Sequence, residues 1–244
     1  MEFEVFDNHF WYILKKFGFE HPFWAISPKP IIFTWAVLLV LLILCILSKI
    51  ALKNKNSVSG FLVLSFIRSF YDLVLQTLGK YSYSHFAFIT SLFIFIFTCN
   101  IIPLIPWLEE PTTDLSTTLA LGLISFIYVQ ATAIGTNGIV GFFEELSSPF
   151  ILFLPLNLVG ELAKVVSISF RLFGNIFGGS IITRLWTSAI GGVFITEVIG
   201  LGLNLVIVSF FVLFEGFIQA FVFSMLTLTY LSIATQGHHV GEEG

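Results

Sequence analysis

The sequence predicts an all-α membrane protein: one polytopic helix bundle with about five transmembrane helices and one interfacial amphipathic helix. Hydrophobic residues make up 57% of the 244 residues and charged residues 11%, and the mean hydropathy is +0.97. Such a chain has too few polar side chains to cover a soluble globule. Several apolar stretches exceed the roughly 18 residues that indicate a bilayer span. No linker or charge block divides the chain, so we expect a single membrane domain over residues 1–244.

The first 30 residues precede the first long apolar run, and we expect them to lie outside the membrane. Acidic side chains, which a basic targeting peptide avoids, recur in this segment: Glu2, Glu4, Asp7 and Glu20. The apolar run that follows is too long for the core of a signal peptide. We therefore expect no cleaved targeting segment and a place in the bacterial inner (plasma) membrane, with an organelle inner membrane as the alternative.

The first predicted span covers residues 31–47, an almost unbroken apolar run with prolines before it and lysines after it. Residues 58–78 differ, because polar residues recur every three or four positions along an otherwise apolar helix. These residues are Ser65, Arg68, Asp72 and Gln76. We therefore place this second helix at the membrane interface.

Residues 86–107 and 115–134 predict a hairpin of two apolar helices joined by an acidic loop. Asp114 lies at the end of this loop. Its main expected role is to cap the second helix, and its secondary expected role is to line an ion path. Asn100 lies in the first helix of the hairpin. A hydrogen bond to a neighbouring helix is its favoured role, and lining of an ion path is the alternative.

A glycine-rich connection over residues 135–141 precedes two final helices, predicted over 151–188 and 193–234. Each exceeds the roughly 20 residues of a perpendicular span, so we expect both to be long and tilted. Basic residues cluster between the first and third apolar segments, which places that connection in the cytoplasm and the N terminus outside. Three lysines near the N terminus favour the opposite orientation.

Arg171 lies in the most apolar third of the chain, with some twenty residues on each side that otherwise indicate membrane-embedded helix. A guanidinium group at the centre of a bilayer costs roughly 2.5 to 3.5 kcal/mol on insertion scales. An arginine in this position therefore indicates a function and a partner for its charge.

Polar residues form a seam along each of the last two predicted helices. At about 100° per residue, one meridian of the fifth helix carries Asn157, Lys164, Ser167, Arg171, Asn175 and Gly178, with Glu161 at its margin. The corresponding face of the sixth helix carries Glu197, Asn204, Glu215 and Gln219. Polar groups left unsatisfied in hydrocarbon cost several kcal/mol each, so the seams must face each other, water or a partner protein. Water-lined proton paths fit this pattern.

Two segments resemble a known family. Residues 170–175, FRLFGN, and residues 218–230 are similar to the signature of subunit a of the F-type ATP synthase, the stator of its proton-driven rotary motor. The resemblance extends over residues 84–234. It includes residues 99–106 and 111–119, which resemble that family's third and fourth helices.

The resemblance implies a mechanism and a set of partners. In this family the arginine faces a ring of c subunits, and two offset half-channels connect each ring carboxylate to opposite sides of the membrane. Arg171 would drive the proton off an arriving carboxylate and block leakage between the half-channels. Gln219 would support Arg171, and Asn175 would line the channel. The expected partners are the c ring, b-type peripheral stalk subunits, lipid and, indirectly, the catalytic head, with no nucleic acid and no cofactor.

The chain departs from the family pattern at two positions. Ser180 stands nine residues after the arginine, where the family usually has Glu or His, and Val212 replaces a second family carboxylate or histidine. Neither side chain relays a proton as an acid or base. We therefore hypothesise that Glu215 is the main titrating group of the inlet half-channel, with Glu197 as the second choice.

Glu161 and Lys164 match family positions near the cytoplasmic outlet. As an i,i+3 pair they equally fit a structural role in which the two charges neutralise each other.

Other classes of protein make different demands on the sequence. A secondary ion-coupled transporter, the main alternative, normally shows two related halves, and no internal repeat is evident here. A structural scaffold would pair Arg171 with Glu215 or Glu197 inside its own chain.

The sequence has no nucleotide-binding loop, so we expect an ion-translocating subunit that is not an enzyme by itself. The histidines lack metal-ligand spacing, so no metal site is expected. The sequence leaves open whether the ion is a proton or sodium.

Overall fold

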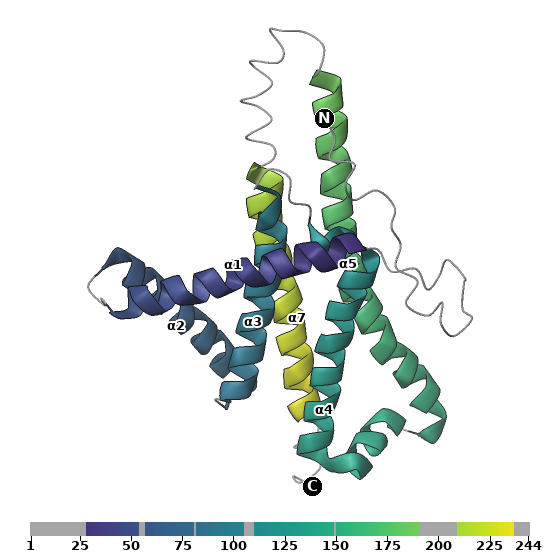
Figure 1. Cartoon of the computed structure of the whole chain (residues 1–244). Helices are drawn as coiled ribbons and strands as arrows, with labels where there is room; N and C mark the ends of the chain where they lie inside the picture. Colours follow the sequence, from purple (N-terminus) through teal and green to yellow (C-terminus); the bar gives the residue numbers. More distant parts are fainter. Residues whose placement is uncertain are drawn as a thin grey trace, which may run out of the picture.

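The computed structural model describes residues 28–53, 57–80, 82–104, 110–148, 150–190 and 209–236 (Figure 1). Within these residues every regular element is a helix, which confirms the predicted fold class. The long helices are α1 (Pro28–Lys53), α2 (Val58–Leu78), α3 (Tyr83–Ile101), α4 (Leu115–Ser147), α5 (Leu154–Ile190) and α7 (Gly216–Gln236). Short turns flank them: η4 (Ile102–Leu104), η5 (Pro111–Thr113), η6 (Ile151–Phe153) and the π-helix η7 (Phe210–Glu215).

Six helices of the described part are long and apolar enough to cross a membrane, so the chain is a multi-pass membrane protein. Helix α2 is one of these six by length and composition, and its interfacial position stays a prediction. Its four polar side chains, from Ser65 to Gln76, are all exposed, as expected for a helix with one polar stripe. The expected extramembrane segment 1–30 and the first part of the sixth predicted helix, 193–208, lie mostly outside the described residues.

The prediction of a glycine-rich connection over residues 135–141 was wrong in its extent. Helix α4 continues through it to Ser147, and only Gly138 leaves the helical conformation, with φ 72° and ψ 168°. Glycine adopts a positive φ without the penalty that a Cβ imposes, so a single residue breaks the helix. Asn137, beside this break, donates a hydrogen bond from Nδ2 to the carbonyl oxygen of Ala234 at the end of α7 (3.3 Å).

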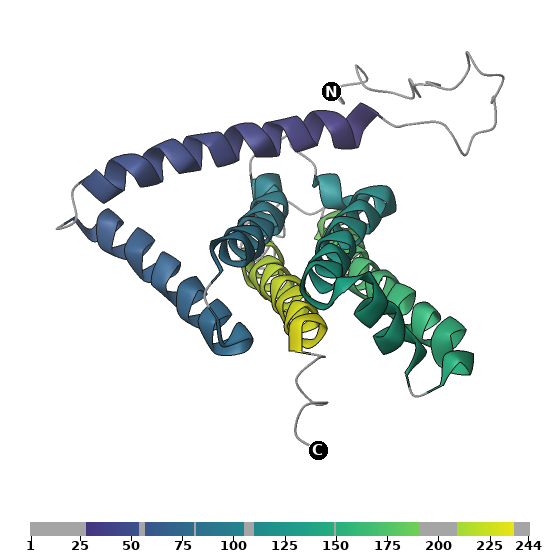
Figure 2. The same cartoon turned by 90° about the horizontal axis from the view of Figure 1, so that it is seen from below.

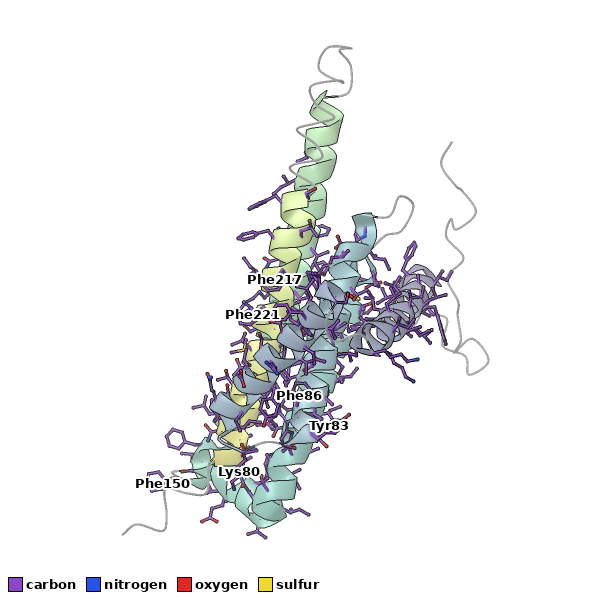
Figure 3. All side chains as sticks on the ribbon, turned by 90° about the vertical axis from the view of Figure 1, so that its left-hand side faces the viewer. Lys80, Tyr83, Phe86, Phe150, Phe217 and Phe221 are labelled. Atoms are coloured by element: carbon purple, nitrogen blue, oxygen red, sulfur yellow. The ribbon has the colours of Figure 1, made fainter. Side chains whose placement is uncertain are left out.

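Helix α7 lies between α3 on one side and the α4–α5 pair on the other, while α1 lies across the bundle (Figures 1 and 2). Aromatic packing joins α2, α3 and α7. Phe93 of α3 lies 4.9 Å from Phe70 of α2 and 5.7 Å from Phe217 of α7, measured between ring centroids. Phe217 and Phe221 follow each other along α7 with nearly parallel rings (Figure 3). This packing fixes the position of α7 at the centre of the molecule.

Two glycines allow close contacts between helices. A Cβ at Gly216 of α7 would stand 2.8 Å from Cβ of Asn100 on α3, and one at Gly122 of α4 would stand 2.1 Å from Oγ of Ser169 on α5. Both distances are shorter than van der Waals contact permits. The absence of a side chain at these two positions therefore sets the spacing of α7 to α3 and of α4 to α5.

We predict that Gly216→Ala destabilises the protein by about 1–3 kcal/mol, because the added methyl group meets the rigid Cβ of Asn100 and pushes α3 away from α7. Gly135→Ala is the matched control. No atom stands within 4 Å of a Cβ at this helical position, and the exchange of Gly for Ala within a helix gains about 0.5–1 kcal/mol. Thermal unfolding of the purified complex in detergent measures both. Equal midpoints for the two variants would contradict the close α3–α7 contact.

Candidate functional site: a polar path along α5 and α7

The polar seams of the last two helices meet at one hydrogen bond. Asn175 of α5 donates from Nδ2 to Oε1 of Gln219 on α7 over 2.6 Å. Gln219 is buried, with 3% of its surface exposed, whereas Asn175 is exposed. The two amides satisfy part of each other's hydrogen-bonding capacity, which is costly to leave unused in an apolar environment. This contact fixes the rotation of α5 and α7 relative to each other.

Arg171 lies one helical turn before Asn175 and is exposed. Within the part of the chain that the structure describes, its guanidinium group makes no hydrogen bond or ion pair. The face of α5 around it is open, since no atom stands within 4 Å of a Cβ at Gly160, Gly174 or Gly178. The pairing with Glu215 that a scaffold protein would require is absent among the described residues, and Glu197 lies outside them.

A polar cluster occupies the end of the bundle where α5 begins and α7 ends. Glu161 accepts hydrogen bonds from Lys164 Nζ at Oε1 (2.5 Å) and from Gln130 Nε2 of α4 at Oε2 (3.1 Å). The Lys164 ammonium group also stands 5.2 Å from the centre of the Tyr230 ring on α7. The expected i,i+3 pair between Glu161 and Lys164 is present, and side chains from two further helices hold it in place.

This cluster borders a cavity of about 380 Å³ between α4, α5 and α7. Gln130, Glu161, Lys164 and Tyr230 all line it, and Asn157, the first residue of the predicted α5 seam, lies in its wall. Asn157 also donates hydrogen bonds from Nδ2 to the backbone carbonyls of Leu146 and Ser148. The cavity holds many water molecules by volume, and its lining offers them both charge signs.

A second group of polar residues lies where α3 ends and α7 begins. Asn100 is buried and donates from Nδ2 to the carbonyl oxygen of Gly216 (3.1 Å), which is the helix–helix bond expected from the sequence. Glu215, half-buried, is the last residue of the π-helix that precedes α7. Short π-helical segments often occur at functional sites, because one extra residue in a turn changes the direction of a side chain.

Glu110, which precedes η5, lies close enough to Glu215 for the two carboxylates to repel each other. One of its oxygens is fully buried. Burial raises the pKa of Glu110 to about 8, and the Glu215 carboxylate adds to this shift. A carboxyl group with this pKa exchanges a proton near neutral pH. The sequence placed Glu110 only in an acidic loop, and no local pattern distinguishes it from a solvated loop residue.

Asp114 caps α4, the first of its two expected roles. Its Oδ1 accepts hydrogen bonds from the backbone N–H of Ser116 (3.1 Å) and from the Ser116 hydroxyl group (2.9 Å). The Ser180 side chain and residues Glu197 and Asn204 lie outside the described part of the structure, so their expected roles stay predictions. Gln130 and Tyr230 belong to the α5 cluster but were not among the residues expected to form the path, because only the packing of α4 and α7 on α5 brings them there.

Comparison with known proteins identifies the family. The family model described as "ATP synthase A chain" matches residues 31–232. The chain is 33% identical over 205 residues to ATP synthase subunit a of Moorella thermoacetica, with 84% of this chain and 89% of that protein covered. It is 32% identical over 246 residues to ATP synthase subunit a of Desulforamulus reducens, with 93% and 88% covered.

A third relative is described by its name as specific for sodium. The chain is 37% identical over 175 residues to "ATP synthase subunit a, sodium ion specific" of Propionigenium modestum, which covers 66% of this chain and 57% of that protein. The family model's match, residues 31–232, includes the arginine motif, both polar clusters and α7 as far as Ser232. The chain therefore belongs to the ATP synthase A chain family.

Proposed function

We propose that this chain is the ion-translocating subunit a of the membrane sector of an F-type ATP synthase, located in a bacterial plasma membrane. The observation that carries the proposal is Arg171, which is exposed on an open face of α5 and has no partner among the described residues of its own chain. A cation in an apolar bundle requires a partner. The partner that fits is a lipid-exposed carboxylate of another subunit, as in a ring of c subunits.

The α5 face around Arg171 suits the approach of another helix. Gly174 and Gly178 lie one turn apart beside Arg171, and small residues with this spacing let helix backbones come close in a membrane. A permanently charged guanidinium then draws the proton off each arriving carboxylate, because the pair of opposite charges is favourable. Unlike lysine, arginine keeps its charge there.

The polar clusters supply one half-channel on each side of Arg171. The inlet consists of Glu110, Glu215 and Asn100, at the start of α7. The outlet is the cavity at the end of α7 that Glu161 and Lys164 line. The Asn175–Gln219 bond lies between them along α7. A fixed positive charge at this level blocks direct hopping between the clusters, so protons must travel with the rotating ring.

The outlet cavity faces the cytoplasm in this proposal. Lys80 and Phe150 lie at the same end of the bundle (Figure 3). Ser232, near the end of α7, donates a hydrogen bond from its hydroxyl to the carbonyl oxygen of Thr77, near the end of α2 (2.8 Å). The basic connection that the positive-inside rule places in the cytoplasm is thus next to the outlet. The transmembrane voltage supplies about 2.3 kcal/mol per charge per 100 mV to drive protons toward it.

We predict that Arg171→Ala abolishes ATP-driven proton pumping and that Arg171→Lys retains only part of it, because lysine gives up its charge more easily in an apolar site. Fluorescence quenching in membrane vesicles measures the pumping. Arg68→Ala, which removes an exposed arginine of α2, is the control and should pump at the wild-type rate. Undiminished coupled pumping by Arg171→Ala would reject the proposed function.

We predict that Glu215→Gln slows ATP-driven pumping by about 10²-fold or more, the range typical for the loss of a general acid or base. Glu144→Gln, which changes an exposed carboxylate of α4, should have no effect. Pumping by Glu215→Gln at the wild-type rate would remove Glu215 from the inlet and leave the role of Arg171 untouched.

We predict that Glu110 titrates near pH 8 in the folded protein. Since this pKa is above the ordinary value of 4.5, ionisation of Glu110 opposes folding. Its destabilising effect is absent at low pH, grows as the pH rises above about 4.5, and levels off above about pH 8. Infrared difference spectra should show a neutral carboxyl band that disappears with a midpoint near pH 8 and is missing in Glu110→Gln. A midpoint near 4.5 would place Glu110 in water instead.

A further inference from the structure

The outlet cavity continues into a narrower space in the direction of Arg171. This space has a volume of about 20 Å³, and it shares Glu161, Lys164 and Tyr230 with the larger cavity. Its other lining residues lie one or two turns further along the same three helices. They are Gly122, Ser125 and Phe126 of α4, Val165 and Ile168 of α5, and Thr227 of α7.

Two buried serine hydroxyl groups lie at this space without a partner among the described residues: Ser125 lines it, and Ser169 lies against Gly122, which also lines it. Ser125 has 4% of its surface exposed. Ser169 is fully buried, and its Oγ occupies the position against Gly122 where a Cβ would otherwise stand. Neither Oγ atom has a hydrogen-bond partner among the described residues. In a helix, a serine hydroxyl often bonds the carbonyl oxygen three or four residues earlier, so two unpartnered ones at the same interface require an explanation.

Water explains both observations. A buried hydroxyl group without a partner costs about 1–3 kcal/mol, and internal water molecules commonly satisfy such groups. A site needs a volume of about 10–15 Å³ to hold one water molecule, so the 20 Å³ of this space holds one. The glycine at position 122 leaves room for the Ser169 hydroxyl group between α4 and α5.

The position of Ser169 gives such water a role. At a rise of about 1.5 Å per residue, Ser169 lies about 3 Å along the α5 axis from Arg171 and about 12 Å from Glu161. Water bound by Ser125 and Ser169 would therefore extend the outlet from the Glu161 cavity to the level of the arginine, on the inner side of α5.

We propose that Ser125 and Ser169 bind internal water between α4, α5 and α7, and that this water, together with the water of the adjoining Glu161 cavity, carries protons toward and from the level of Arg171. The binding of water follows from the buried hydroxyl groups alone. Its part in proton transfer rests on the proposed function.

Radiolytic labelling of the intact wild-type complex tests the water site without any mutation. Short X-ray pulses produce hydroxyl radicals from water beside a side chain, and mass spectrometry locates the added oxygen. Ile168 lines the narrow space and is 5% exposed, whereas Ile96 of α3 is fully buried in the apolar core. We expect Ile168 to be labelled at least about threefold faster, since water occupies polar sites and leaves apolar ones dry. Equal rates for the two isoleucines would overturn the proposal.

The double variant Ser125→Ala/Ser169→Ala tests proton transfer. We expect ATP-driven pumping to fall at least about fivefold, because the internal water loses the two hydroxyl groups that bind it. Ser232→Ala is the matched control, since it removes a buried hydroxyl group that is bonded to Thr77 within the protein. Wild-type pumping by an assembled double variant would overturn the transport role. If the double variant fails to assemble, the labelling of the wild-type complex still decides whether water is bound.

The outcomes separate this proposal from the proposed function. Normal pumping by the double variant, together with loss of pumping in Arg171→Ala, would reject only the internal path. Normal pumping by Arg171→Ala would reject the proposed function, while faster labelling of Ile168 would still establish the water site.

Discussion

The charge of Arg171, which has no partner among the described residues, is the constraint on which the rest of the structure depends. Its cost in an apolar bundle is several kcal/mol unless another group compensates it. Within the described residues no acid of this chain does so, and the glycine-rich face of α5 leaves the guanidinium group accessible to another helix. The Asn175–Gln219 hydrogen bond, one turn away, holds α5 in the rotation that keeps Arg171 outward.

The two ends of α7 carry polar clusters of different electrostatic character. Glu110 and Glu215 are two carboxylates close enough to repel each other, and this repulsion adds to the rise in the pKa of Glu110. Glu161 instead accepts hydrogen bonds from Lys164 and Gln130. The first cluster thus brings two negative charges together, whereas the second pairs a negative charge with a positive one.

The chain differs from the family pattern at two positions, and the arrangement of its carboxylates bears on both differences. Ser180 and Val212 stand at two positions where the resemblance to the family implies a side chain that exchanges protons. The structure offers another carboxylate pair instead: Glu215 at the end of a π-helix and Glu110 from the loop before α4. In a proton path each titratable group must lie within reach of the next one in space. Its position in the sequence does not matter. A pair drawn from two separate segments meets this requirement.

The sequence by itself determined the membrane class, the helical fold, the polar seams and the family, because hydrophobic periodicity and the arginine motif are local patterns. It also placed Arg171 and Asn175 on one polar seam and Gln219 on another, since a helix fixes which residues share a face. Only the tertiary structure decided that Glu110 stands beside Glu215, that Gln130 bonds Glu161, and that Gly122 makes room for the Ser169 hydroxyl group. These pairs are separated by 31 to 105 residues in the chain, and the packing of helices, which no local pattern encodes, brings them together.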